Sequence, residues 1–256
     1  DKFYRYGIMM SEVEQIMACI RAFNDEDNYK MIGELPLYIE KSTSFDIRAL
    51  AQVHDFGALL EVLDKTPYAD LIRPFSVTNM EDFDYTACES VLRKYFYDQV
   101  MKIVDQEFSG KVKKEIKEIF LTQIELDNIT RIYRSKRYFN ATPAQIKKVI
   151  NPVYLRIPKR ELEEMIDHCN AEEFMERLAR SAYHNYLDSS NFAYIEYHAQ
   201  SINYNLNKRH MISTNPDIVL IAYLVLSETE IQNVVDIIEG VRYGIPADKI
   251  NRLLIY

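Results

Sequence analysis

The sequence predicts an all-α fold, and three observations carry this prediction. Apolar residues recur at every third or fourth position over long stretches, most clearly in residues 84–104, which is typical of helices that bury one face. The 256 residues include only 6 glycines and 8 prolines, whereas sheet-rich folds use many of both in tight turns. No long stretch alternates apolar and polar residues, and the Asn-Gly and Asp-Gly pairs typical of hairpins are absent.

Capping residues place several helix starts in chain order. Asp55 precedes a leucine-rich stretch and is expected to accept a hydrogen bond from the first turn. Thr142 followed by Pro143 combines a capping hydroxyl with proline at the first helical position. Asn170 and Glu173 have the spacing of a capping box, in which each side chain accepts from the backbone N–H group of the other. These signals predict helices that begin just after Asp55, Thr142 and Asn170.

An internal repeat runs through the chain. Residues 124–138 match residues 229–243 at a constant shift of 105, and a short loop and a second helix follow in both copies. Residues 12–21 match the start of the same block. Upstream, residues 59–68 match residues 174–183 at a shift of 115. A period of about 100 residues is a common domain size and is far longer than a solenoid unit.

The repeat predicts one partial and two whole helical domains. The boundaries are expected at residues 1–39 for the end of a first domain, 40–156 for a second and 157–256 for a third. The partial first copy and the absence of an initial methionine indicate a fragment. Repeated domains of this size are expected to build a ring, arch or funnel.

Five polar residues recur at matching positions of the repeat, beside an apolar helix face: Glu12, Glu125, Glu230, Asn128 and Asn233. The carboxylates would form a functional ring at the domain junctions, or they would make a repeated structural contact with a backbone N–H group or an arginine. We favour the structural contact, because an unpaired buried carboxylate is costly. The two asparagines are interpreted in the same way, as satisfied buried amides.

A basic cluster stands out on an otherwise acidic chain: Arg131, Arg134, Lys136 and Arg137. It would contact an acidic partner surface, or it would be a solvated helix face, as most charge runs are. Both interpretations stay open, and the partner interface is the candidate functional site of the chain.

Composition excludes several classes of function. The net charge of −8 disfavours general nucleic-acid binding. The glycines never cluster as a phosphate cradle requires, and the cysteines and histidines show no spacing typical of a nucleophile or metal site. We therefore expect no catalytic residue, no cofactor and no metal. The three cysteines are interpreted as buried thiols of a cytoplasmic chain, and the longest apolar run, residues 218–226, as a buried helix too short to span a bilayer.

The ordered set of repeated segments resembles a known family, the subunit called C or d in V-type ATPases. Residues 230–234 and 240–246 are similar to its C-terminal signature, and residues 58–63 followed by Thr-Pro-Tyr at 66–68 to its leucine-rich segment. Residues 125–129 resemble the matching segment of its middle domain. The resemblance covers the whole chain, although most of the first domain is missing.

The resemblance implies both a fold and a function. The implied fold is three similar helical domains around a pseudo-threefold axis, which form a funnel. The implied function is that of a non-catalytic connector between central-stalk subunits and the membrane rotor ring, which transmits torque for ATP-coupled proton or sodium transport. The chain would then be cytoplasmic and peripheral to the membrane, without a span of its own.

Two other classes of function stay open beside the connector. A helical scaffold or adaptor unrelated to rotary ATPases would form a superhelix with a concave peptide groove. A helical enzyme would enclose a pocket with convergent titratable groups.

Overall fold

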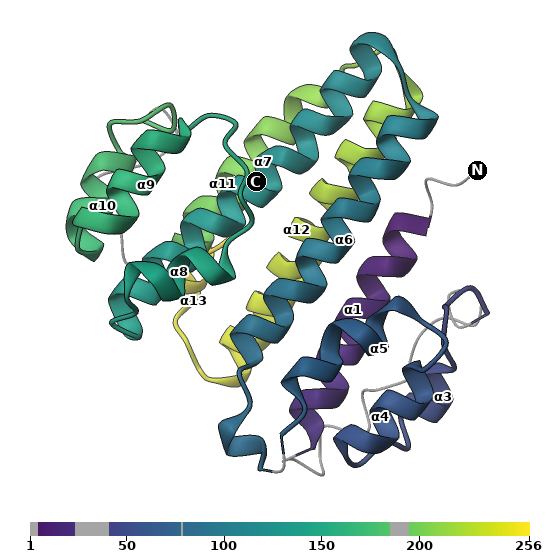
Figure 1. Cartoon of the computed structure of the whole chain (residues 1–256). Helices are drawn as coiled ribbons and strands as arrows, with labels where there is room; N and C mark the ends of the chain where they lie inside the picture. The colour runs from purple at the N-terminus through teal and green to yellow at the C-terminus, as the bar shows by residue number, and fades with distance from the viewer. Residues whose placement is uncertain (1–4, 24–40, 78, 185–194) are drawn as a thin grey trace. The chain divides into compact units, whose positions relative to one another are not determined.

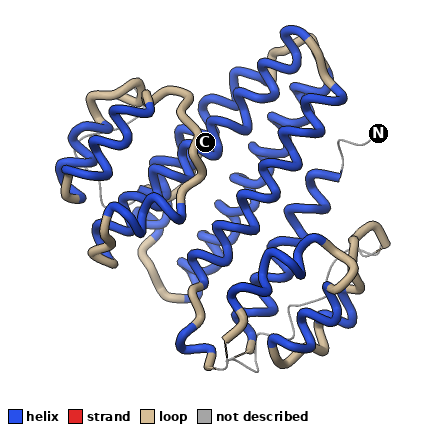
Figure 2. The backbone as a smooth tube through the Cα atoms, viewed as in Figure 1, coloured by secondary structure: helices blue, strands red, loops and turns tan. Residues whose placement is uncertain are grey.

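Helices joined by loops make up the described part of the chain, with no strand among residues 5–23, 41–77, 79–184 and 195–256 of this computed structural model (Figures 1 and 2). The predicted all-α class is therefore confirmed. The pseudo-threefold arrangement of the domains stays a prediction.

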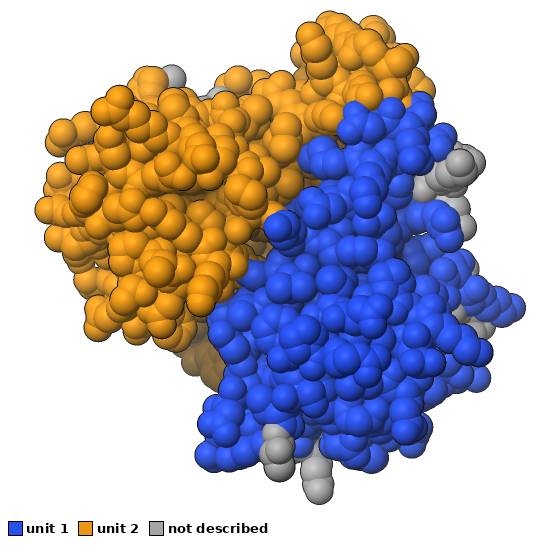
Figure 3. Space-filling model, in the orientation of Figure 1, with its two compact units in different colours: residues 1–107 blue, residues 108–256 orange. Residues whose placement is uncertain are grey.

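The chain divides into two compact units, Asp1–Glu107 and Phe108–Tyr256, called unit 1 and unit 2 below (Figure 3). The division at 107/108 falls inside the predicted second domain, 40–156. The predicted boundary at 39/40 lies outside the described residues. The repeat-based domains stay a prediction, because a repeat is defined by sequence similarity and a compact unit by packing.

Unit 1 is built on two longer helices. Its elements are α1 (Arg5–Ala22), α3 (Ile47–Leu50), α4 (Phe56–Leu63), α5 (Pro67–Ile72), 3₁₀ turns at Arg73–Phe75 and Met80–Asp82, and α6 (Tyr85–Glu107). Helix α1 packs against α6 and α3, and α5 packs against α6. The apolar stripes of these helices meet in a core that includes Ile16, Leu59 and Leu92, all fully buried.

Unit 2 is built on three helices of at least 16 residues. Its elements are α7 (Gly110–Tyr138), α8 (Pro143–Val149), α9 (Lys159–His168), α10 (Ala171–Leu178), α11 (Ile195–His210), α12 (Pro216–Arg242) and α13 (Ala247–Asn251). Helix α11 packs against α7 and α12, α10 packs against α7, and α13 packs against α12. The C-terminal half of α7, the short helices α8, α9 and α10, and α11 share one apolar core, which includes Ile132, Ile146, Phe174 and Ile202.

Local capping explains where the short helices α4, α8 and α10 begin, as the sequence predicts. The Asp55 carboxylate accepts from an N–H group of the first turn of α4 at 2.9 Å. Thr142 and Gln145 form a capping box at the start of α8. Asn170 and Glu173 form a second one at α10, with the two hydrogen bonds at 2.8 and 2.9 Å. These three predictions are confirmed, because a cap depends on residues only three positions apart.

The two longest helices of unit 2 end in similar ways. After α7, Asn140 has φ 46°, and after α12, Gly244 has φ 66°. Left-handed residues of this kind commonly terminate helices. The next N–H group then reaches back to a carbonyl of the last turns, Ser135 in α7 and Gly240 in α12. A short helix follows each stop, so the segment predicted to repeat has the same order of elements in both copies.

The apolar stretch 218–226 lies in the first half of α12. Ile218, Ile221 and Val225 are buried, whereas Leu220 and Tyr223 are exposed. The prediction of a buried helix is therefore correct for one face only. Among the described residues, α12 is the one helix whose length and composition would suffice to cross a membrane, and 28% of its most apolar window is buried.

Candidate interaction surfaces

Glu12 lies on the buried face of α1 and binds two groups of the segment that follows. Its carboxylate accepts from the backbone N–H of Ser44 and, at 2.7 Å, from the hydroxyl of Tyr68. Burial, together with the neighbouring Glu12 carboxylate, raises the pKa of the Tyr68 hydroxyl above its usual range. Tyr68 is therefore a neutral donor at physiological pH, and the contact joins α1 to the start of α5.

Glu125 makes the corresponding contact in α7 with more donors. Its carboxylate accepts from the backbone N–H groups of Leu155, Arg156 and Ile157 at 2.8 to 3.1 Å. It also accepts from the Tyr183 hydroxyl at 2.6 Å. Burial and the Glu125 carboxylate raise the pKa of that hydroxyl, so Tyr183 also stays protonated. Below, this arrangement of glutamate, backbone N–H groups and tyrosine is called a carboxylate clasp.

The clasps are built from residues far apart in the chain. Glu12 and Tyr68 are 56 positions apart, and Glu125 and Tyr183 are 58 apart. Both glutamates thus accept hydrogen bonds from backbone N–H groups, which is the structural contact that we favoured for them. Neither tyrosine is among the predicted site residues, although both occupy the last position of the two segments that match at a shift of 115.

The two repeated asparagines make matching contacts. Asn128 donates to the carbonyl of Asn151 at 2.6 Å and accepts from its N–H at 2.9 Å. Asn233 does the same with Ile255, at 2.7 and 3.0 Å. Each amide thus binds the backbone of one residue in the segment after the following short helix. Asn128 is fully buried and Asn233 is half-buried, so both amides are satisfied.

Glu230 differs from the other two repeated carboxylates. It is exposed on α12, and no described residue hydrogen-bonds to or pairs with its side chain. The helix around it carries the apolar pattern of α7 at the shift of 105, and this part of α12 is also exposed. The repeated glutamate is therefore buried and hydrogen-bonded in α1 and α7, and exposed in α12.

Residues of the basic cluster form ion pairs and hydrogen bonds with other residues of unit 2. Arg134 pairs with Glu196 of α11 at 3.4 Å, and Arg137 pairs with Glu172 of α10. The side chains of both arginines are about half-exposed. Arg131 also has a partner within the structure.

Lys136 differs from the three arginines because it is partly buried. Its ammonium donates to the carbonyls of Ile166 and Cys169 at 2.7 and 2.6 Å, at the C-terminal end of α9. Burial lowers the pKa of this ammonium group. A cation at a helix C-terminus is favourable, so Lys136 fastens α9 to α7. Whether the cluster binds a partner stays a prediction.

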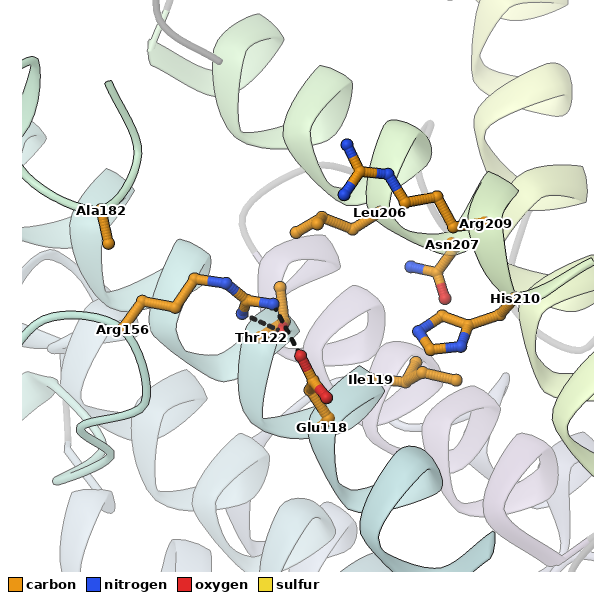
Figure 4. A pocket seen from close by; sticks show the side chains of 9 residues that line it. All are labelled: Glu118, Ile119, Thr122, Arg156, Ala182, Leu206, Asn207, Arg209 and His210. Carbon is orange, nitrogen blue, oxygen red and sulfur yellow. Dashed lines mark hydrogen bonds and ion pairs between the residues drawn. The ribbon is translucent and has the colours of Figure 1, made fainter. Parts of the chain in front are cut away.

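A cavity of about 410 Å³ lies in unit 2, among α7, α11 and the segment that carries Arg156 (Figure 4). Its lining residues are Glu118, Ile119, Thr122, Arg156, Ala182, Leu206, Asn207, Arg209 and His210. The Arg156 guanidinium donates to Thr122 at 2.6 Å and pairs with Glu118 at 2.9 Å. Because the Arg156 backbone also binds Glu125, this arginine fixes its segment to α7 at two places.

The three cysteines are buried free thiols. Burial raises the pKa of Cys19 and of Cys88 to about 12, so at neutral pH both are protonated and poor nucleophiles. Among the described residues, no three histidine, cysteine or acidic side chains gather as metal ligands would.

One family description matches the chain. The model of the family described as "ATP synthase (C/AC39) subunit" matches residues 1–253. No curated protein sequence matches the chain. The match covers both units and every repeated segment, in agreement with the resemblance seen in the sequence. The chain therefore belongs to the ATP synthase (C/AC39) subunit family, whose members are subunits of V-type rotary ATPases and lie at the periphery of the membrane sector.

Proposed function

We propose that this chain is a non-catalytic connector, which links the central stalk of a V-type ATPase to the membrane rotor ring and transmits torque. The observation that carries this proposal is the family match over residues 1–253. In the assembled enzyme, ATP would be bound by other subunits, and this chain would couple that chemistry to the movement of protons or sodium ions.

The geometry supports a mechanical role. Helices α7 and α12 contain 29 and 27 residues, so each is a rod of roughly 40 Å at 1.5 Å per residue. The clasp at Glu125 ties the segment after α8 to α7 through charge-assisted hydrogen bonds, which are about twice as strong as neutral ones. A subunit that transmits torque needs long helices and strong contacts that hold neighbouring segments to them. The long helices of unit 2 and the clasp at Glu125 fit this requirement.

Co-assembly tests the proposal directly. We expect the immobilised full chain to retain central-stalk subunits and rotor-ring subunits together, and to bring the two into one complex that does not form without it. Calorimetric titration of the chain alone with Mg-ATP should show no micromolar binding, whereas the assembled complex should hydrolyse ATP.

Two results would contradict the connector function. Retention of neither set of subunits would favour a scaffold unrelated to rotary ATPases. Tight Mg-ATP binding by the isolated chain would favour a catalytic or nucleotide-regulated role.

A further inference from the structure

The cavity beside α7 and α11 has the size of a small-molecule site. Its volume is about 410 Å³, and pockets that bind small ligands typically measure about 300 to 1,000 Å³. The N-terminal half of α7, the end of α11 and the segment after α8 all contribute to its wall (Figure 4). These elements belong to unit 2, so a ligand in this cavity contacts residues of one compact unit.

The charged side chains of the cavity wall are predominantly basic. Arg156 comes from the segment after α8, and Arg209 and His210 come from the last turn of α11. Glu118 is the one carboxylate among the described lining residues, and it pairs with Arg156 at 2.9 Å. Two arginines and one glutamate leave a net positive charge even when His210 is neutral. The cavity therefore favours an anionic ligand over a cationic one.

Asn207 of α11 contributes a buried hydrogen-bond acceptor to the wall. The residue is 1% exposed, and its Nδ2 donates to the backbone carbonyl and to Oδ1 of Asn203, at 2.9 and 3.0 Å. Because a backbone carbonyl can only accept, these bonds fix which way round the Asn207 amide lies. Its Oδ1 is then the one buried side-chain nitrogen or oxygen of the described residues that has no hydrogen-bond partner.

This acceptor narrows the chemistry of the ligand. A buried acceptor without a donor is unfavourable, so a ligand that supplies an O–H or N–H group to Oδ1 gains from doing so. Figure 4 shows the Asn207 amide pointing into the cavity, on the same side as His210. An apolar ligand would leave both the acceptor and the positive charge unmatched. The cavity therefore fits a ligand that is an anion and also a hydrogen-bond donor.

We propose that this cavity binds a phosphate monoester that carries hydroxyl groups, such as a sugar phosphate. Such a phosphoryl group is close to dianionic at neutral pH and has three strong acceptor oxygens, enough for Arg156, Arg209 and His210. Guanidinium groups match phosphate oxygens well, and Arg156 uses two of its five N–H donors on Thr122 and Glu118. A hydroxyl of the ligand donates to Oδ1 of Asn207. The proposal is independent of the connector function.

Calorimetric titration of the full chain tests the site with matched probes. We expect glucose 6-phosphate to bind with a dissociation constant below about 1 mM and to raise the melting temperature. Glucose lacks the phosphoryl group and should not bind. Cyclohexyl phosphate has a ring of the same size without hydroxyl groups, and it should bind about tenfold more weakly, because Oδ1 of Asn207 then has no donor.

A pair of neighbouring substitutions tests whether the charge in the cavity matters. Arg209→Gln removes a charge from an exposed lining residue and should weaken glucose 6-phosphate binding by about tenfold or more. Lys208→Gln removes the same charge from the same turn of α11, outside the cavity lining, and should bind as the unmodified chain does. Both residues are exposed, so circular dichroism should show the same helix content in both variants.

A substitution of Asn207 tests the hydroxyl contact separately. Asn207→Leu keeps the side-chain size and removes the acceptor, so this variant should bind glucose 6-phosphate and cyclohexyl phosphate about equally. If Asn207→Leu does not fold, the comparison of the two probes on the unmodified chain still tests the hydroxyl contact.

Hydroxylated phosphate monoesters occur both as soluble metabolites and as headgroups of inositol lipids, and a vesicle experiment distinguishes these sources. Binding of glucose 6-phosphate identifies a soluble ligand. Binding only to phosphatidylcholine vesicles that contain phosphatidylinositol 4-phosphate, with loss of that binding in Arg209→Gln, identifies a lipid headgroup of the same chemistry.

Three results would overturn the proposal. The first is that neither glucose 6-phosphate nor the vesicles bind. The second is that Lys208→Gln weakens binding as much as Arg209→Gln, which would show general charge attraction instead of a site. The third is that the unmodified chain binds cyclohexyl phosphate as tightly as glucose 6-phosphate.

Discussion

Glu125 is a fully buried carboxylate in a core of apolar residues. Removing such a group from water is costly unless hydrogen bonds replace the lost hydration. Three backbone N–H groups and the Tyr183 hydroxyl supply them, within 2.6 to 3.1 Å. The carboxylate also accepts from three backbone N–H groups of the loop 155–157, which lies outside any helix and so has no hydrogen bonds of a helix to satisfy them. The clasp is therefore a mutual arrangement, in which each side would be unsatisfied without the other.

We predict that Glu125→Gln lowers the free energy of unfolding by about 3 kcal/mol, because an amide loses the charge and turns an NH₂ group toward N–H donors. Tyr183→Phe should cost about 1 to 2 kcal/mol, since it removes one donor only. Urea unfolding followed by circular dichroism measures both.

The matched control is Glu230→Gln, the same substitution at the repeated position of α12. Glu230 is exposed, so the change should stay within about 0.5 kcal/mol. Equal losses for Glu125→Gln and Glu230→Gln would show that the clasp contributes nothing specific to stability.

At the scale of the element, α13 packs closely on α12 because Gly240 has no side chain. A Cβ atom at Gly240 would lie 2.6 Å from Cδ1 and 2.7 Å from Cγ1 of Ile250, and Ile250 is buried in α13. Glycine within a helix is unfavourable by about 1 kcal/mol relative to alanine. The close approach of α13 is therefore the physical reason for a glycine at this position.

We predict that Gly240→Leu displaces α13 and lowers the free energy of unfolding by roughly 1 to 3 kcal/mol, as overpacking does. Limited proteolysis should then cut faster near residues 243–246. In Gly7→Leu the same side chain is added to α1, where no described residue lies within 4 Å of the new Cβ, so stability should be unchanged or slightly higher. Similar melting and cleavage of the two variants would show that Gly240 is not needed for packing.

At the scale of the whole molecule, the basic cluster is the predicted contact surface for the rest of the ATPase. The pairs of Arg134 with Glu196 and of Arg137 with Glu172 are about half-exposed. Exposed pairs of this kind contribute only about 0.2 to 1 kcal/mol to stability. Either arginine could therefore leave its carboxylate in this chain and pair with a carboxylate of a partner. Lys136, in contrast, hydrogen-bonds to the carbonyls at the end of α9.

We predict that the double variant Arg134→Glu, Arg137→Glu binds central-stalk and rotor-ring subunits more weakly at low salt, and that high salt reduces the difference from the unmodified chain. Its melting temperature should change little. Pull-down at two salt concentrations, with thermal melting alongside, measures both effects.

A charge swap separates partner binding from internal pairing. Arg137→Glu combined with Glu172→Arg restores the pair between α7 and α10 with its charges reversed. If Arg137 contacts a partner, binding should stay weak in this variant. Full recovery of binding by the swap would show that the internal pair, and not a partner contact, is the role of Arg137.

The sequence by itself determined the all-α class, the helix starts at Asp55, Thr142 and Asn170, and membership of the family. Helix periodicity and capping act between residues three or four positions apart, so a single stretch of sequence contains all that decides them. The repeat likewise marked Glu125 and Glu230 as equivalent positions, because similarity at a fixed shift needs no structure.

Only the tertiary structure decided what those equivalent residues do. The donors to Glu125 lie 30 to 58 positions away, so no local pattern could identify Tyr183 as its partner. Burial is also a property of what packs on a helix rather than of the helix itself. The same apolar pattern is therefore core in α7, where α9 and α10 cover it, and surface in α12, where Glu230 and its neighbours are exposed.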